Sequence, residues 1–196
     1  MAEVRGWDER TDVTAVVLVG GRSRRFGSDK LAAPLDGTSV LDRLLADLPA
    51  SWPLVLVGPR RDTVRDDGVW TVEDPPGGGP LAAVAAGLAE VDTDLTAVLA
   101  GDMPYAAEAL PLLLAALGTR SEEPAVAAVA VDEADRANPL LAVYHRAAVA
   151  HVVTGVAAGE PARRLLELPH RRVRVAGAAA RDIDTRADLD DLTGPR

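Results

Sequence analysis

Short apolar runs that end in glycine constrain the fold of this chain more than any other feature. Residues 14–19 (TAVVLV), 54–57 (LVLV) and 95–100 (LTAVLA) contain only apolar residues and threonine, and glycine follows each run directly. Strands that are apolar on both faces are typical of a mainly parallel sheet whose two faces are both covered. Helical patterns alternate with these runs, which predicts an α/β fold with a mainly parallel sheet and helices on both faces.

The remaining segments fit the same alternation. Thr38 or Ser39 is placed to cap a helix with one apolar face, and Pro80 suits the first position of another helix. Helices are expected over residues 40–48, 81–90, 106–117, 145–156, 161–168 and 185–192, and further strands over 69–73, 126–131, 140–144 and 173–175. No internal repeat or long linker divides the chain. We therefore expect one domain over residues 13–192, with a flexible tail at 1–12 and a short tail at 193–196.

Charge and composition exclude several classes of protein. The 196 residues include 21 Lys+Arg and 30 Asp+Glu, a net charge of −9, which argues against a nucleic-acid-binding surface. The absence of cysteine excludes disulfides and thiolate metal sites. The first ten residues contain no apolar signal segment, and the longest candidate span, 106–117, is shorter than the roughly 20 residues that cross a membrane. We expect a cytoplasmic protein that binds neither nucleic acid nor membrane.

Lysine usage singles out one position. Of the 21 basic residues only Lys30 is a lysine, which indicates a coding bias that has replaced lysine by arginine wherever only charge mattered. A compact ammonium and a planar guanidinium are not equivalent in their contacts. Lys30 therefore marks a position that needs an ammonium; survival by chance is the alternative.

The turn after the first apolar run has the features of a phosphate site. Gly20 and Gly21 leave backbone N–H groups open to a ligand, and three arginines and Lys30 follow within nine residues. Such a turn beside clustered cations is typical of polyphosphate binding. The pattern is neither a Walker loop nor the dinucleotide motif G-x-G-x-x-G. A tight turn with a solvated basic loop is the alternative.

Two acidic segments are candidates for a metal site. Asp102 lies just beyond the third apolar run, where parallel sheets bind ligands, and a carboxylate there suits Mg²⁺. Its alternative role is to cap the next helix. Asp182 and Asp184 would face the same way on a short strand and supply further ligands. Their alternative is a helix start, because Thr185 and Asp188 have the spacing of a capping box.

Five motifs, taken in order, resemble those of one enzyme family. They are LVGGRSRRFGSDK, VEDPPGGGPLAAVAAGL, LAGDMPY, RANPLLAVYHRA and DIDTRADL, and they look like the motifs of the molybdenum cofactor guanylyltransferases, which are MobA-like nucleotidyltransferases. The resemblance covers about residues 13–192. It implies a single Rossmann-like nucleotidyltransferase domain. It also implies transfer of GMP from GTP to the phosphate of molybdenum-bound molybdopterin, with Mg²⁺ as cofactor and release of pyrophosphate.

The resemblance also assigns site residues. The nucleotide-binding residues that it implies are Leu18, Gly20, Gly21, Lys30, Asp74, Gly79 and Asp102. The catalytic residues that it implies are Lys30, Arg24, Arg25 and Asp102. Asp102 is the implied magnesium ligand, and Asp182 and Asp184 are further candidates.

Departures from the family pattern leave alternative functions open. Asp182 and Asp184 stand where the family has two asparagines, and Ala83 stands where it has a glycine. The alternatives are transfer of CMP to the same pterin, transfer from GTP to another phosphorylated acceptor such as phospholactate, and nucleotide binding without turnover. A labile pterin would be passed between proteins, so molybdenum-insertion proteins and molybdoenzyme chaperones are candidate partners.

Overall fold

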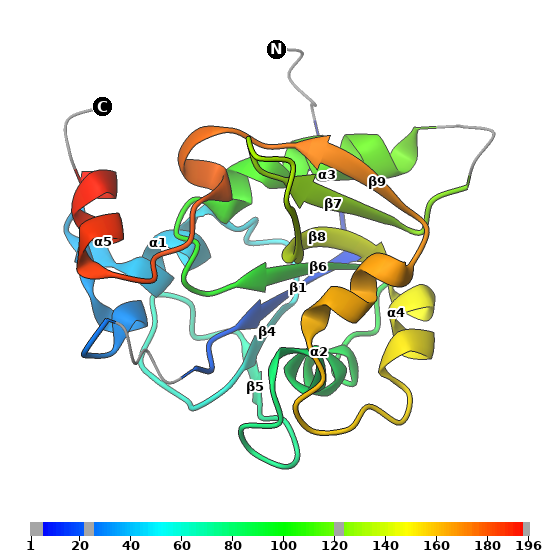
Figure 1. Ribbon diagram of the computed structural model, residues 1–196, viewed down its shortest axis with the longest axis horizontal. Helices are drawn as coiled ribbons and strands as arrows, with labels where there is room; N and C mark the ends of the chain where they lie inside the picture. The colour runs from blue at the N-terminus through cyan, green and yellow to red at the C-terminus, as the bar shows by residue number, and fades with distance from the viewer. Residues whose placement is uncertain (1–5, 22–25, 120–123, 194–196) are drawn as a thin grey trace.

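A seven-stranded sheet forms the centre of the protein in the computed structural model (Figure 1), which describes residues 6–21, 26–119 and 124–193. Its strands are β1 (Val13–Leu18), β4 (Leu54–Val57), β5 (Val69–Thr71), β6 (Leu95–Ala100), β7 (Ala127–Val131), β8 (Ala137–His145) and β9 (His170–Arg174). A separate hairpin comprises β2 (Pro34–Leu35) and β3 (Thr38–Ser39). The α-helices are α1 (Val40–Asp47), α2 (Pro80–Leu88), α3 (Leu110–Gly118), α4 (Arg146–Val153) and α5 (Arg186–Thr193). The 3-10 turns are η1 (Lys30–Ala32), η2 (Ala106–Ala109), η3 (Ala162–Glu167) and η4 (Gly177–Ala180).

The sheet is parallel except for one strand. The strand order is β5-β4-β1-β6-β8-β7-β9, and only β8 runs antiparallel to its neighbours. From β1 the chain proceeds to β4 and β5 on one side, and then crosses to β6 on the other side. This change of direction places a topological switch point between β1 and β6, where open α/β sheets bind their ligands. The expected mainly parallel sheet is confirmed.

Both faces of the sheet are buried. On one face, alternate residues of β1 such as Val17 pack with α1 and α3. On the other face, residues such as Val16 pack with α2, α4 and η3. Because side chains alternate along a strand, burial on both faces explains why β1 is apolar throughout. The expected helices on both faces are confirmed.

Some elements differ from the sequence expectation. The expected helix over 106–117 begins as η2 and becomes α-helical at Leu110, with Pro111 in the first turn of α3. Because proline has no N–H, it cannot continue α-helical bonding from the preceding turn. The segment 161–168 forms the 3-10 turn η3 instead of an α-helix, and β8 starts at Ala137, three residues before the expected start. The β2–β3 hairpin was not expected.

The ends of the elements agree with the capping signals. Ser39, and not Thr38, caps α1 by accepting a hydrogen bond from Asp42 N at 3.0 Å.

In the segment expected to be an N-terminal tail, the Trp7 ring packs edge-to-face against Trp52, with centroids 5.8 Å apart. The domain limits stay a prediction. None of the helices in the described ranges is long and apolar enough to cross a membrane.

Candidate active site

Three neighbouring strands end in glycines that pack backbone against backbone. β4, β1 and β6 lie side by side and are followed by Gly58, Gly20 and Gly101. A Cβ on Gly58 would lie 2.6 Å from Gly20 N, and one on Gly101 would lie 2.9 Å from Leu18 O. No side chain fits at either position without moving the backbone. The glycines that end the apolar runs therefore hold the carboxyl edge of the sheet together, beneath the candidate site.

A cavity of about 560 Å³ lies beside this edge, between the turn after β1 and the start of α2. It is lined by Leu18, Gly20, Gly21, Pro59, Val72, Glu73, Pro76, Gly77, Gly79, Pro80 and Ala83. The volume is in the range of small-molecule sites. The structure thus brings together four residues that the resemblance assigned to nucleotide binding, namely Leu18, Gly20, Gly21 and Gly79.

The loop before α2 presents Glu73 to the cavity. Glu73 Oε1 accepts a hydrogen bond from Gly77 N at 3.1 Å, which braces the turn. Gly79, the N-cap of α2, has φ +94°, a backbone conformation that favours glycine. Asp74 is exposed and is not among the residues that line the cavity. Its assignment to the nucleotide stays a prediction.

Lys30 joins the loop after β1 to the end of β6. Its ammonium donates to Asp102 Oδ2 at 2.5 Å and to Asp184 Oδ1 at 3.3 Å. The side chains of Lys30 and Asp102 are 15% and 19% exposed, whereas that of Asp184 is 47% exposed. Burial alone would lower the pKa of Lys30, but bonds and charges from Asp102 and then Asp184 outweigh it and raise the pKa. The predicted site therefore has a charged ammonium at its centre.

The segment 182–184 is held against Asp102. Ile183 is fully buried, and its N–H donates to the backbone oxygen of Asp102 at 3.0 Å. Asp182 is exposed as a whole residue, yet desolvation of its carboxyl group raises its pKa, and the charges of Asp102 and Asp184 add to this effect. A hydrogen bond from its own backbone and the charge of Lys30 oppose the rise. Three carboxylates thus gather around one lysine.

The alternative role of helix capping is correct for the segment at Asp182–Thr185 and wrong for Asp102. Thr185 and Asp188 form the reciprocal box: Asp188 Oδ2 accepts from Thr185 N at 2.7 Å, and Asp188 N donates to Thr185 Oγ1 at 3.2 Å. This prediction is confirmed, while the Asp184 carboxylate is directed to Lys30 instead. For Asp102 the capping role is wrong, because the N-cap of η2 is Tyr105 and makes no side-chain cap bond.

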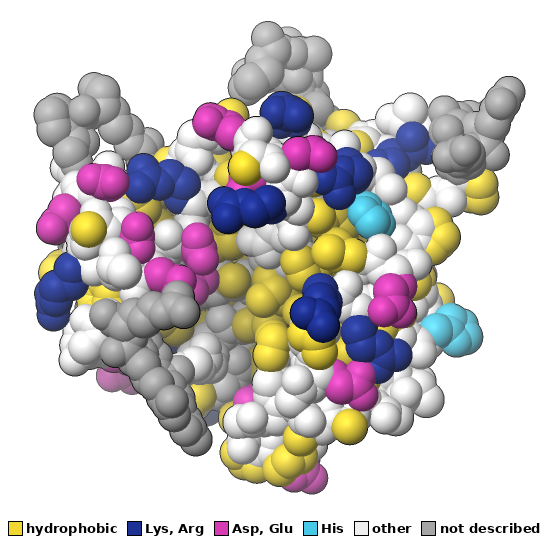
Figure 2. Space-filling view, in the orientation of Figure 1, with side chains coloured by type: hydrophobic (Ala, Val, Ile, Leu, Met, Phe, Trp, Pro, Cys, Tyr) yellow, Lys and Arg dark blue, Asp and Glu magenta, His cyan; other side chains and the backbone are white. Residues whose placement is uncertain are grey.

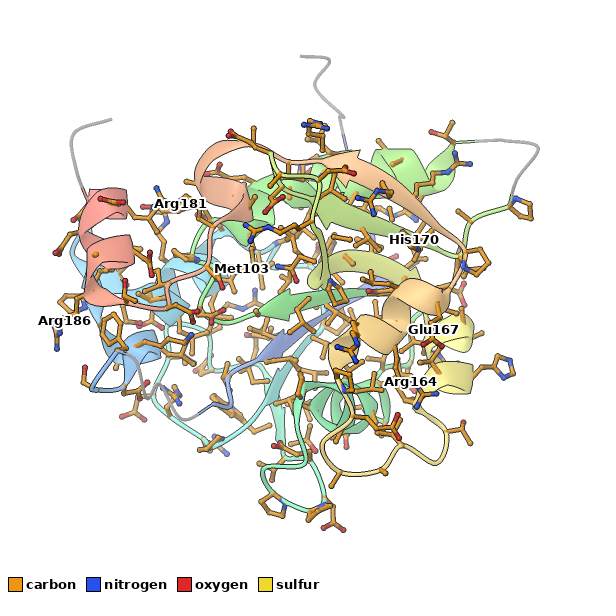
Figure 3. The ribbon with its side chains drawn as sticks, viewed as in Figure 1. Met103, Arg164, Glu167, His170, Arg181 and Arg186 are labelled. Carbon is orange, nitrogen blue, oxygen red and sulfur yellow. The ribbon has the colours of Figure 1, made fainter. Side chains whose placement is uncertain are left out.

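A second cavity, of about 260 Å³, has Asp182, one of these three carboxylates, in its wall. It is lined by the ends of β7 and β8 and by residues after η4, among them Arg136, Asn138 and Asp182. Asn138 Nδ2 lies 3.4 Å from the sulfur of Met103, which follows Asp102 beyond the end of β6 (Figure 3). Figure 2 shows hydrophobic side chains in a hollow near the centre of the view, with Lys and Arg side chains above it and to its right and Asp and Glu side chains to its left.

Some site residues were not found from the sequence, and others lie outside its described part. Arg24 and Arg25 fall outside the described residues. Arg61 was missed: it donates to Asp29 Oδ2 at 2.6 Å and to the backbone oxygen of Val19 at 3.3 Å. The only signal for it was an arginine pair after the second apolar run. Asn138 was noticeable as the single asparagine of the chain.

The donor set suits a hard divalent cation that is held partly by a ligand. Within the ranges that the structure describes, no group of three or more His, Asp or Glu residues is placed to hold a metal ion. The carboxylate oxygens of Asp102 and Asp184 nevertheless both face one cation, the Lys30 ammonium. Mg²⁺ typically takes one or two protein carboxylates together with phosphate oxygens and water, and these residues fit that mode of binding.

The site combines glycine turns, a cavity of nucleoside size and a lysine with carboxylates at the switch point. On an α/β fold, this combination is that of a nucleotidyltransferase. The model of the MobA-like NTP transferase domain matches residues 15–175, and the chain belongs to this family. A relative from Chloroflexus aggregans, named a probable molybdenum cofactor guanylyltransferase, is 31% identical over 93% of this chain and 85% of its own length. A relative of the same name from Deinococcus radiodurans is also 31% identical, over 93% of this chain and 94% of its own.

Solved structures have the same fold. A protein from Mycobacterium sp. strain JC1 superposes with a TM-score of 0.74 and 25% identity, over 94% of this chain and 96% of its own. The expected single nucleotidyltransferase domain of the Rossmann-like α/β type is therefore confirmed.

Proposed function

We propose that this protein transfers GMP from GTP to the terminal phosphate of molybdenum-bound molybdopterin. An acceptor phosphate oxygen attacks the α-phosphorus of GTP, the bond from that phosphorus to the β-phosphate bridge breaks, and pyrophosphate leaves. The observation that carries this proposal is the pairing of Lys30 with Asp102, which joins the loop after β1 to the end of β6 at the switch point. The relatives named as guanylyltransferases support the choice of GTP and of the acceptor.

The nucleoside of GTP would occupy the larger cavity. The backbone amides of Gly20 and Gly21 would contact its phosphates, and Lys30, with Arg24 and Arg25 of the same loop, would neutralise their charge. Asp74 and the backbone around Gly79 would accept hydrogen bonds from the base. Such a site accelerates phosphoryl chemistry by positioning and by charge neutralisation, without a covalent intermediate.

Asp102 would hold Mg²⁺ together with the phosphates, and Asp182 and Asp184 are the further candidate ligands. The bound ion would supply charge neutralisation on the phosphate oxygens. Lys30, which contacts Asp102 and Asp184, keeps both carboxylates oriented toward the same point.

The acceptor would enter from the side of the smaller cavity. This cavity adjoins a wider one of about 540 Å³, and the two share Asp132, Arg136, Ala180 and Asp182. Arg136 is a cation at the rim, with a side chain that is 81% exposed. Together the two cavities offer polar and charged groups to a phosphorylated pterin, and the carboxylate-bearing Asp182 lines both of them.

Pyrophosphate release with molybdopterin and each of the four nucleoside triphosphates tests the proposal. We expect GTP to be preferred over CTP, ATP and UTP by at least about tenfold in kcat/KM, a difference of about 1.4 kcal/mol. A clear preference for CTP would identify a cytidylyl transferase instead. Pyrophosphate release with GTP and phospholactate, but not with GTP and molybdopterin, would contradict the proposed identity of the acceptor.

A further inference from the structure

Arg61 connects two distant points of the chain next to the nucleotide cavity. It lies two residues beyond Pro59, which lines that cavity, and its side chain is only 23% exposed. One guanidinium nitrogen, Nη1, donates to Asp29 Oδ2 at 2.6 Å, and the other, Nη2, donates to Val19 O at 3.3 Å. A planar guanidinium can bind two acceptors at once in this way, whereas an ammonium lacks this geometry.

The two acceptors are the two ends of the glycine loop. Val19 precedes Gly20 and Gly21, and Asp29 immediately precedes Lys30. The residues between them form the segment that the resemblance assigns to the phosphates. Arg61 therefore ties the residue before the two glycines to the residue before Lys30. Holding binding groups in place before the ligand arrives lowers the entropy that binding costs.

Asp29 passes this constraint to Lys30. Its other oxygen, Oδ1, accepts a hydrogen bond from Leu31 N at 3.1 Å and so caps η1, the turn that begins with Lys30. Its Oδ2 is held by Arg61, so both oxygens of one carboxylate have defined partners. The contacts run from Arg61 through Asp29 to the turn that carries Lys30, and from Lys30 to Asp102.

We propose that Arg61 is a positioning residue, which holds Gly20, Gly21 and Lys30 in the geometry that binds nucleotide phosphates without touching the nucleotide itself. This inference rests on the proposed function, because it assumes that the loop binds GTP. An ordinary exposed ion pair contributes little to stability. The Asp29 side chain is 52% exposed, so the pair differs from that kind not by burial of both partners but because it fixes the residue next to Lys30 and because Arg61 also donates to Val19 O.

A double-mutant cycle tests the proposal. The Kd of GTP with Mg²⁺ is measured by calorimetry for the wild type, Arg61→Ala, Asp29→Ala and the double variant, with Arg60→Ala as the matched control. Arg60 is the adjacent, exposed arginine. We expect each single variant to raise the Kd about tenfold and the double variant to raise it by much less than the hundredfold of two independent effects, because the two residues share a contact. Arg60→Ala should bind like the wild type.

Steady-state kinetics separates positioning from general destabilisation. Arg61→Ala should raise the KM for GTP and leave the KM for the acceptor unchanged, at a temperature well below its melting point. An additive increase of about a hundredfold in the double variant would overturn the proposal, because Arg61 would then act on the nucleotide independently. Wild-type affinity in Arg61→Ala would also overturn it.

One further variant, Arg61→Lys, and the wild type complete the test. Should Arg61→Ala not fold, Arg61→Lys and Asp29→Ala decide the matter, since wild-type affinity in both would contradict the proposal. A wild-type protein that does not bind GTP contradicts the proposed function as well, whereas normal binding with insensitive variants contradicts only the role of Arg61.

Discussion

The ammonium of Lys30 lies 2.5 Å from Asp102 Oδ2, across 72 positions of sequence. The contact joins the loop that follows β1 to the end of β6, the two strands that flank the switch point. Both side chains are largely buried, so loss of the Lys30 ammonium would leave the Asp102 carboxylate without its partner, whereas Lys30 keeps a second partner in Asp184. The candidate phosphate-binding lysine and the candidate metal-binding carboxylate are therefore one unit, and variants of each should show it.

Lys30→Ala and Lys30→Arg should both lose most nucleotide transfer, by a factor of about 10²–10³. Alanine removes the charge between Asp102 and Asp184, and arginine replaces a compact ammonium by a bulkier planar group that does not fit the same two contacts. Pyrophosphate release measures the loss, and circular dichroism checks that the fold is kept. Near-normal activity in Lys30→Arg would show that this position requires charge alone.

Asp102→Asn should lower magnesium-dependent turnover by about a hundredfold while thermal stability changes little. The amide still accepts a hydrogen bond from Lys30, but its oxygen carries no charge for a cation. Asp184→Asn is the matched comparison and should lose less, because its carboxylate is more exposed and its contact with Lys30 is longer, at 3.3 Å. Titrating Mg²⁺ against pyrophosphate release provides the measurement. Equal losses in the two variants would contradict this ranking.

Asp188→Ala should destabilise the protein by up to about 1 kcal/mol, because it removes the acceptor of the bonds from Asp184 N and Thr185 N, which is one half of the capping box at the start of α5. In a chain of this size the melting temperature should fall by roughly 2–4 °C. Asp190→Ala, on the exposed side of the same helix, is the control and should melt like the wild type. An unchanged melting temperature in Asp188→Ala would show that the cap contributes no stability.

The same cap predicts a pH dependence. Hydrogen bonds from the side chain and then the backbone of Thr185 hold the pKa of Asp188 below its ordinary value of 3.8. A carboxyl whose pKa is lower in the folded than in the unfolded state stabilises the fold above the unfolded value, and this contribution is lost as the pH falls through the folded value. The difference in stability between wild type and Asp188→Ala should therefore shrink below about pH 3.8. A difference that is constant down to pH 2 would contradict the linkage.

The sequence predicted the fold where local pattern and burial agree. Residues 54–57 and 95–100 are apolar on both sides, and β4 and β6 have the bounds expected for them. The expectation was less accurate where a local exception decides the structure, as at Pro111 in the first turn of α3. The β2–β3 hairpin has two residues in each strand, too few for any periodicity to appear.

The site was predictable only in part, because some of its contacts join residues that are far apart in the sequence. Lys30 and Asp102 each follow a recognisable strand, so topology alone brings them to one edge of the sheet. Arg61 acts through contacts with Asp29 and Val19, which are 32 and 42 positions away. Nothing in the local pattern of an arginine pair encodes a partner at such a separation.

Two adjacent acidic residues should have separable effects on nucleotide choice. Glu73 lines the nucleoside cavity and braces its loop through Gly77 N, so Glu73→Ala should weaken GTP and CTP alike by distorting that wall. Asp74, exposed beside it, is predicted to accept hydrogen bonds from the N1–H and amino group of guanine, donors that cytosine does not present in the same arrangement. Asp74→Ala should therefore weaken GTP selectively.

Calorimetry with Mg²⁺ and each nucleotide measures both effects. Losing a hydrogen-bond partner that the bound base would bury costs about 1–3 kcal/mol, enough to reduce a preference for GTP by about tenfold or more. For Glu73→Ala we expect both Kd values to rise by a similar factor, so that their ratio is kept. For Asp74→Ala only the Kd of GTP should rise. An unchanged ratio of the two Kd values in Asp74→Ala would show that Asp74 does not recognise the base. Base selection would then depend on the backbone of the loop around Gly79. Gly79 is the N-cap of α2 and lines the same cavity.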